Sequence, residues 1–153
     1  MAAKSAYETS VREIAQLFAD YLDGDAARPG LAVSERPLPE PARSALERSF
    51  EAFGFEAPSC AFVTLTARNP EAEGGDIALD PQALFLLVES LDPLFLVSAD
   101  RASTDLLERA YRGHVTQTRA FGRPAAIFAD FPKLLETDSG KHEAWRTLKS
   151  LKA

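Results

Sequence analysis

Apolar residues along this chain recur with two different periods, and the change from one to the other predicts alternating helices and strands. From Ser5 to Leu22 they recur about every three to four residues, the spacing of an amphipathic helix, and Ser5 with Glu8 has the spacing of a capping box. From Cys60 to Arg68 the side chains alternate between two faces. The first pattern predicts an N-terminal helix and the second predicts a strand.

Start and stop residues predict the remaining elements. Further helices are expected at 41–53, 81–91, 103–112 and 141–152. Strands are expected at 94–100, 114–121 and 124–130, the first an internal strand and the second a mixed edge strand. Asp80 and Ser103 are the expected N-caps of their helices. Gly54 is expected to end the helix 41–53 with Phe55 packed back on Phe50.

The segment 25–41 interrupts this alternation. It holds four prolines and a glycine without a sustained period, which predicts an irregular connection. The chain is therefore divided into an N-terminal amphipathic helix with a proline-rich connection, residues 1–39, and an α/β domain, residues 40–153. In that domain the order strand, helix, strand, helix, strand, strand, helix favours parallel strands joined by crossover helices.

The composition is that of a globular protein: 153 residues, 46% hydrophobic and 26% charged. A formal charge of −6 disfavours nucleic acid as a partner of the surface as a whole. Cys60 is the single cysteine, so one chain cannot build an internal disulfide or a cysteine-based metal site. No membrane span or signal peptide is recognised, and the expected location is cytoplasmic.

Polar residues at the carboxyl ends of the predicted strands mark the candidate binding site, because open α/β sheets bind ligands there. These residues are Thr64, Arg68, Asn69, Ser98, Asp100 and Asp130. On parallel strands Asp100 and Asp130 could together hold a divalent cation; the favoured alternative is that both end strands and start turns. No nucleophile or phosphate-loop motif occurs, and His114 and His142 are expected on the solvated surface.

The predicted terminal helix carries two signals. It is locally basic through Lys141, His142, Arg146, Lys149 and Lys152. These cations could contact phosphate, but their favoured role is to complement the helix dipole. Trp145 shares one stripe with Leu148 and Leu151, so it is expected to anchor the core rather than to stack on a base.

Four stretches follow the order of a known set of motifs. Residues 130–135 read Asp-Phe-Pro-Lys-Leu-Leu, and residues 141–149 read Lys-His-Glu-Ala-Trp-Arg-Thr-Leu-Lys. With Phe-Val-Thr-Leu at 62–65 and Val-Ser-Ala-Asp-Arg-Ala-Ser at 97–103, the region from Ala42 to Lys149 resembles the uracil-DNA glycosylase superfamily, closest to its iron–sulfur bacterial and archaeal branch. The resemblance implies a three-layer α/β/α fold with a small, mostly parallel four-stranded central sheet flanked by helices.

The departures from the family motifs fall on the chemistry. Leu65 stands where the family has the asparagine that reads the flipped base, and a leucine side chain makes no hydrogen bond. Asp130 stands where the family has a histidine that stabilises charge developing on the uracil, and a carboxylate opposes that charge. The family's Gly-Glu-x-Pro-Gly motif has no recognised counterpart before Ala42, and the strand that precedes it in the family is either lost or replaced by residues 29–36. One cysteine cannot hold a four-iron cluster. The resemblance therefore implies a retained scaffold with another use.

Three hypotheses follow for the function. The leading one is a catalytically inactive, glycosylase-like protein that binds a protein partner as an accessory factor in DNA replication or repair, without metal or cofactor. Its N-terminal helix is a candidate docking element, although packing of that helix on its own domain is favoured. The second is a nucleic-acid binder that uses cations near the sheet ends and behind them: Arg68, Arg101, Arg119, Arg123, Lys141, Arg146 and Lys149. The third is an atypical glycosylase or hydrolase in which Asp130 and Asp100 converge in a cleft.

Overall fold

The computed structural model describes residues 6–68, 76–116, 118–120 and 122–151, of which 6–11, 67–68 and 76–77 are described as backbone. The helices are α1 (Ala6–Leu17), α2 (Glu40–Ala52), α3 (Pro81–Leu91), α4 (Arg101–Ala110), α5 (Phe131–Leu134) and α6 (Asp138–Lys149). The strands are β1 (Leu22–Asp23), β2 (Gly30–Ser34), β3 (Cys60–Thr64), β4 (Thr66–Arg68), β5 (Asp76–Ala78), β6 (Phe95–Ser98), β7 (Arg119–Ala120) and β8 (Arg123–Ile127).

The central sheet is mixed. Among the described residues it has six strands in the order β1-β3-β2-β6-β8-β7. β2, β3, β6 and β8 are parallel, while the two-residue strands β1 and β7 run antiparallel at the two edges. The α/β class is confirmed, but the expectation of four strands is wrong. The two additional strands are β1, which is too short to show a period, and β2, which lies in the segment expected to be irregular; of the described residues in the expected strand 114–121, only Arg119–Ala120 form β7. The predicted strand 60–68 also divides, since β4 leaves the sheet and pairs with β5 in a separate hairpin.

β2 corrects the expectation of an irregular connection at 25–41. It pairs with β3 on one side and with β6 on the other, and all five of its residues are buried. A strand buried on both faces shows no alternation of apolar and polar residues, and the prolines that flank β2 are typical of a loop sequence. Gly30 is required where β2 begins, because a Cβ there would overlap the Phe95 ring and lie 2.8 Å from the Cys60 sulfur. Residues 30–34 are therefore a structural centre of the sheet.

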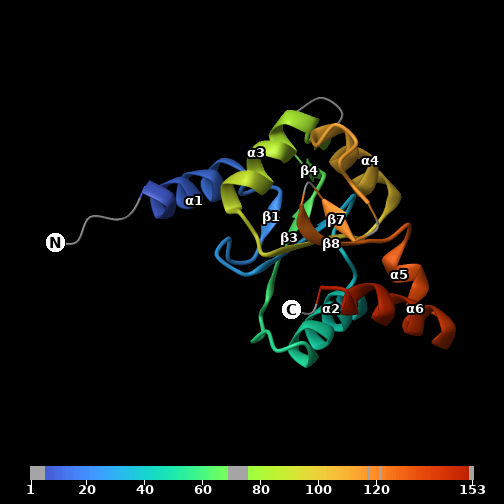
Figure 1. Ribbon diagram of the computed structural model, residues 1–153. Coiled ribbons are helices and arrows are strands. Elements are labelled where there is room, and N and C mark those ends of the chain that lie inside the picture. The colour runs from blue at the N-terminus through green and yellow to red at the C-terminus, as the bar shows by residue number, and fades with distance from the viewer. Residues whose placement is uncertain (1–5, 69–75, 117, 121, 152–153) are drawn as a thin grey trace.

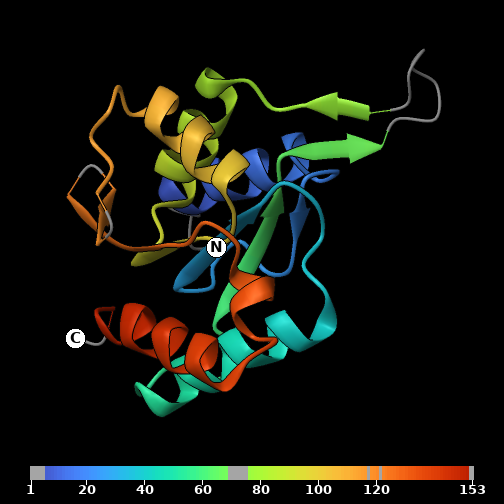
Figure 2. The same cartoon turned by 90° about the vertical axis from the view of Figure 1, so that its right-hand side faces the viewer.

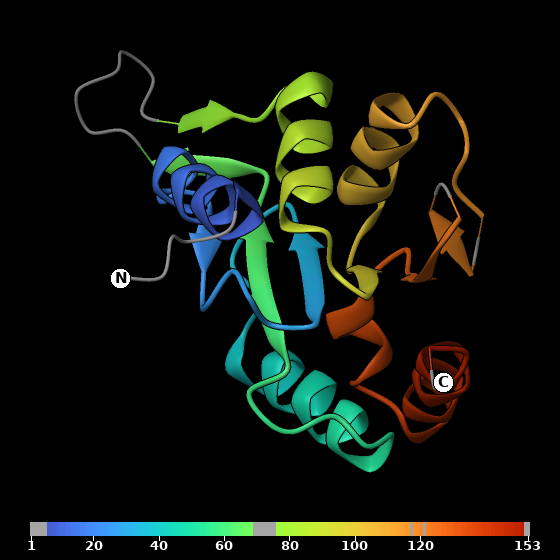
Figure 3. The same cartoon turned by 60° about the vertical axis from the view of Figure 1, so that its left-hand side comes forward.

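Helices cover both faces of the sheet (Figures 1 and 3). α1, α3 and α4 pack on one face, where alternate strand residues such as Leu31, Val63 and Leu96 form one hydrophobic cluster. α2, α5 and α6 cover the other face, where Phe62 and Val97 belong to a second cluster. The alternation predicted from Cys60 onward thus separates the two cores that the sheet divides.

α1 packs on its own domain through the last part of its apolar stripe. Phe18, which follows the helix, is buried in the same cluster as α3, and Ile14 packs against that cluster, whereas Leu17 is exposed. The first turns of α1 extend away from the sheet in Figure 1. No helix among the described residues combines the length and the apolar character that crossing a bilayer requires.

The helix ends mostly follow the local signals. Asp80 caps α3 by accepting a hydrogen bond from the Ala83 amide at 2.7 Å, as predicted. The Phe55 amide donates to the Phe50 carbonyl at 2.9 Å and the two rings are in contact, so the predicted end of α2 is confirmed. α4 differs, because its N-cap is Asp100 and not Ser103. The proposed capping box of Ser5 and Glu8 lies outside the described side chains.

Candidate functional site

The carboxyl ends of β2, β6 and β8 meet at one shallow cavity, which we call the carboxyl-end hollow. Its volume is about 410 Å³ and it is lined by Glu35, Arg36, Pro37, Leu38, Pro39, Asp100, Arg101, Ala102, Ala129, Asp130 and Pro132. The chain segments that follow β6 and β8 bond to each other there: the Arg101 amide donates to the Ala129 carbonyl at 3.0 Å, and the Phe131 amide donates to the Ala99 carbonyl at 2.8 Å. Asp100 and Asp130 are thereby brought to the same edge of the sheet.

The Asp100 carboxylate is engaged by backbone donors. One oxygen accepts from the Ser103 amide at 2.9 Å as the N-cap of α4, and the other accepts from the Glu35 amide at 2.8 Å. The second bond ties the segment after β2 to the start of α4. Asp100 therefore holds two of the segments that line the hollow.

Asp130 has the corresponding role at α5. Its Oδ1 accepts from the Lys133 amide at 3.2 Å, so it caps this short helix. The metal hypothesis required the strands that carry Asp100 and Asp130 to be parallel, and β6 and β8 are parallel. However, among the described residues no three His, Cys, Asp or Glu side chains are grouped so that they could hold an ion. The alternative in which both aspartates end strands and start turns describes their observed contacts.

The other predicted site residues do not all reach the hollow. Ser98 is buried, and its hydroxyl lies 2.8 Å from the Thr104 hydroxyl and 3.3 Å from the Asp100 carbonyl. The Thr64 hydroxyl donates to the Thr66 carbonyl. Leu65 is 6% exposed and belongs to the hydrophobic cluster beneath α3. The Arg68 side chain and Asn69 lie outside the described part of the structure.

Glu35 and Arg36 also line the hollow, although the sequence pattern did not predict them as site residues; Arg101, expected near the sheet ends in the nucleic-acid hypothesis, lines it as well. Glu35 and Arg36 were missed because β2 was not recognised as a strand, so its carboxyl end was not sought. The missed signal was the short apolar run Leu31–Val33, followed after Ser34 by two charged residues.

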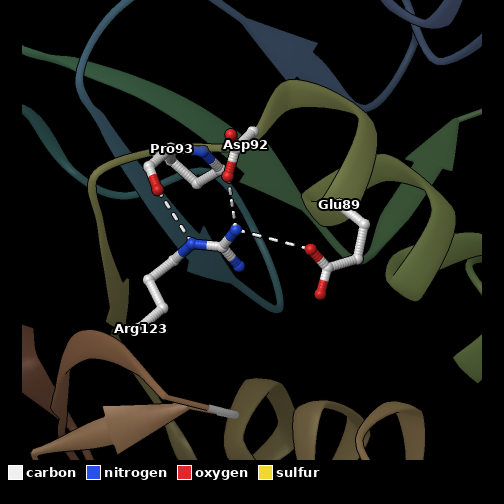
Figure 4. Close-up of polar contacts among 4 residues, drawn as sticks. All are labelled: Glu89, Asp92, Pro93 and Arg123. Atoms are coloured by element: carbon white, nitrogen blue, oxygen red, sulfur yellow. Dashed lines mark hydrogen bonds and ion pairs between the residues drawn. The ribbon is translucent and has the colours of Figure 1, made fainter.

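The cations of the nucleic-acid hypothesis do not gather at this edge. Arg123 is the first residue of β8 and Arg119 pairs beside it on β7, so both lie at the amino end of the parallel strands, away from Arg101. Arg123 is also turned inward, as Figure 4 shows. Its Nε donates to the Pro93 carbonyl at 2.8 Å, and its Nη2 lies 2.8 Å from Asp92 and 3.4 Å from Glu89. Arg101, Arg119 and Arg123 therefore lie near the sheet ends as expected, but at opposite ends, so they do not form one cationic surface.

The Arg123 cluster instead fixes the end of α3 against β8. Burial alone would lower the pKa of the guanidinium, but the bonds to Asp92 and Glu89 outweigh burial and hold that pKa above its ordinary value. Arg123 thus remains charged and paired. Its role is structural, in agreement with the 13% exposure of its side chain.

We expect the Arg123→Met variant to lower the free energy of unfolding by about 2 kcal/mol, because it leaves the Pro93 carbonyl and two carboxylates without their donor. Arg123→Lys is the matched control: it keeps the charge, but an ammonium cannot reproduce the planar fork, so we expect an intermediate loss. Urea unfolding measures both values. Equal stability of all three proteins would show that the cluster contributes nothing.

Cys60 has no catalytic geometry. It is fully buried at the start of β3, and burial, followed by the nearby Glu47 carboxylate, raises the pKa of its thiol. The Glu47 carboxylate accepts hydrogen bonds from the Ser59 hydroxyl and from the Ser59 and Cys60 amides. The thiol therefore stays protonated, and Cys60 packs as a small buried hydrophobic residue.

A second hollow lies among the helices α2, α5 and α6, which cover one face of the sheet. It has a volume of about 450 Å³ and is lined by Pro41, Ala45, Arg48, Ser49, Phe131, Leu135, Lys141, Ala144, Trp145 and Leu148; we call it the α2–α6 groove. Trp145 is 40% exposed at this groove, so the expectation of a core anchor is wrong for it, whereas Leu148 and Leu151 are buried. The apolar stripe of α6 is thus only partly covered by the domain.

Comparisons with protein-family models and with curated proteins found no match to this chain. The functional assignment therefore rests on the geometry of the two hollows and on the motif positions that line the sheet edge.

Proposed function

We propose that this protein is a catalytically inactive, uracil-DNA-glycosylase-like domain that acts by binding a protein partner, as an accessory factor in DNA replication or repair. One observation carries the proposal. The two motif positions that would recognise and activate a base are both used by the fold itself: Leu65 packs in the hydrophobic core and Asp130 caps α5.

These contacts oppose base excision for physical reasons. A leucine side chain in the core offers no donor or acceptor to the edge of a flipped base. The Asp130 carboxylate accepts a hydrogen bond from the Lys133 amide. A leaving uracil needs a positive charge or a hydrogen-bond donor at this position, whereas Asp130 presents a negative charge. Restoring activity would require changes at both positions.

The segment after β2 supports the scaffold part of the proposal. Ser34, Glu35, Arg36, Pro37 and Leu38 follow a parallel strand with the spacing of Gly-Glu-x-Pro-Gly, and they keep the glutamate and the proline. We therefore infer that this segment is the counterpart of the motif, the alternative that the sequence left open for residues 29–36. Both glycine positions are replaced: the Ser34 hydroxyl donates to the Arg36 carbonyl at 2.6 Å, and Leu38 is buried. The loop therefore lacks the bare backbone with which glycines approach a phosphate closely.

The α2–α6 groove supports the protein-binding part. It is an apolar hollow between two helices that carries an exposed tryptophan, and aromatic side chains of this kind dominate the energetics of protein interfaces. The carboxyl-end hollow differs in its lining: five charged residues stand beside its prolines, Leu38 and alanines, and none of its described lining residues is aromatic.

We expect no release of uracil from single-stranded or duplex DNA by the purified protein, because neither Leu65 nor Asp130 can perform the family's chemistry. The measurement is a base-release assay at low and high salt, with an active glycosylase as positive control. The Asp130→Asn variant keeps an acceptor for the α5 cap and removes the charge. Release by the wild type that disappears in Asp130→Asn would overturn the proposal and make Asp130 a catalytic residue.

A second candidate, nucleic-acid binding, is favoured by a different surface. Residues 109–129 contain no aspartate or glutamate. Arg109, Arg112 and His114 line a hollow of about 590 Å³ together with Phe85, whose ring is 42% exposed. Cations beside an exposed ring are the elements of a single-strand binding surface. In the same assay, strongly salt-dependent binding of a labelled oligonucleotide that is weakened by Arg112→Glu and not by Arg36→Glu would favour this candidate.

A further inference from the structure

The α2–α6 groove lies between two helices that are distant in sequence and adjacent in space (Figure 2). At one end of it the Phe53 ring, which follows α2, packs against the Trp145 ring of α6 with centroids 4.8 Å apart. Ala144, Leu148 and Phe131 line the groove and are at most 2% exposed. The groove thus has a rigid apolar floor built from the second hydrophobic cluster and an aromatic wall that solvent reaches.

The charged side chains that line the groove have one sign. Arg48 of α2 and Lys141 of α6 are the two charged residues in its described lining, and both are exposed. Among the described residues, neither of them takes part in an ion pair. In a chain of net charge −6, a cationic rim formed by these two residues makes this surface complementary to an acidic partner and unfavourable for a basic partner.

We propose that the α2–α6 groove binds an acidic amphipathic helix of a partner protein. The apolar stripe of that helix would lie on Ala144, Leu148 and Trp145, and its carboxylates would pair with Arg48 and Lys141. Helix-in-groove recognition of this kind uses apolar residues spaced about one turn apart, with flanking charges that select the partner. The inference rests on the proposed protein-binding function and adds to it the place and the chemistry of the partner.

Trp145 provides the measurement, because it is the single tryptophan of the chain. Exclusion of water from the indole moves its emission to shorter wavelength, so the emission reports occupancy of the groove directly. The probe is a synthetic helical peptide without tryptophan, with leucines spaced one turn apart and glutamates on both flanks of the leucine stripe. A matched peptide carries lysines in place of the glutamates. We expect a saturable blue shift with the glutamate peptide and at least about a tenfold weaker response with the lysine peptide.

Charge reversal tests the rim. We expect the Arg48→Glu and Lys141→Glu double variant to bind the glutamate peptide about tenfold more weakly, since each exposed pair contributes a factor of about two to five. The same variant should gain affinity for the lysine peptide. Arg146→Glu is the control on α6: it makes the same change of charge as each single substitution, at an exposed position outside the groove lining, and we expect it to leave binding unchanged. Because all three positions are on the surface, thermal unfolding of the variants should match that of the wild type.

Four results would overturn the inference. They are the absence of any emission shift with the glutamate peptide, equal affinity for both peptides, an emission shift that depends on protein concentration alone and so indicates a second copy in the groove, and a shift produced by an oligonucleotide but by neither peptide. The assay is independent of base release. If the protein binds the peptide and also releases uracil, the proposed inactivity is refuted and the proposed role of the groove stands. If it neither binds the peptide nor releases uracil, only the proposed role of the groove is refuted.

Discussion

A Gly140→Ala substitution is expected to lower the free energy of unfolding by about 3 kcal/mol, although alanine is the better helix former. Gly140 lies in the first turn of α6, and a Cβ there would overlap the Leu134 carbonyl oxygen and lie 2.8 Å from its carbon. That oxygen belongs to the backbone at the end of α5, so it cannot move aside as the tip of a flexible side chain would. Helix propensity and packing therefore predict opposite signs, and packing is the larger effect.

Urea unfolding of Gly140→Ala measures this loss. Glu143→Ala is the matched control, because Glu143 is exposed in the same helix and its replacement should change the stability by less than about 0.5 kcal/mol. If Gly140→Ala proves as stable as the wild type, the corner between α5 and α6 can separate at little cost. The wall of the α2–α6 groove would then be less rigid than the structure shows, because α5 and α6 both contribute to it.

A Gly30→Ala substitution is expected to cost about 2 to 3 kcal/mol by overpacking the centre of the sheet. The added methyl group would collide with the Phe95 ring on β6 and approach the Cys60 sulfur on β3, and both neighbours are almost fully buried. The Phe95 ring cannot turn away freely, because it also packs against Phe50 at a centroid distance of 4.6 Å and against Phe55 at 5.0 Å.

A double-mutant cycle with Phe95→Leu tests that explanation. The smaller side chain should make room for the methyl group, so the double variant should be more stable than the sum of the two single losses predicts by about 1 kcal/mol. Urea unfolding of the four proteins gives this coupling energy. Additive losses would show that Gly30 is needed for another reason, such as its contact with Cys60.

The two glycines show how the candidate sites depend on the packing of the domain. Gly30 allows β2 to lie close to both neighbours, and β2 brings Glu35 and Arg36 to the carboxyl-end hollow. Gly140 allows α6 to pack on the end of α5, and these two helices contribute half of the residues that line the α2–α6 groove. Neither glycine lies in a motif with recognisable chemistry.

The structure separates the surfaces that the three hypotheses need. The carboxyl-end hollow brings Asp100 and Asp130 together but engages both with backbone amides. The arginines divide between the two ends of the parallel strands, and Arg123 is already paired with Asp92 and Glu89 within the fold. The α2–α6 groove combines an apolar floor, an exposed aromatic ring and an unmixed cationic rim. These differences favour protein binding over the other hypotheses.

The sequence by itself determined the features that depend on neighbours along the chain. The alternation of β3, the helix α3 with its Asp80 cap and the end of α2 at Gly54 could all be predicted, because periodicity and capping involve residues only a few positions apart. The candidate site was predicted in part: Asp100 and Asp130 end parallel strands, so their meeting at one sheet edge follows from the order of the elements.

Only the tertiary structure decided what depends on contacts between distant segments. β2 has no period of its own and becomes a strand because β3 and β6 bond to it from both sides. Arg119 and Arg123 lie at the amino end of the sheet because the chain returns in the direction of β6, which strand pairing sets. Trp145 has the spacing of a core residue, yet it remains exposed because it lines the groove between α2 and α6, where no other element of the described chain covers it. Pairing and packing join residues far apart in the sequence, and a local pattern carries no record of them.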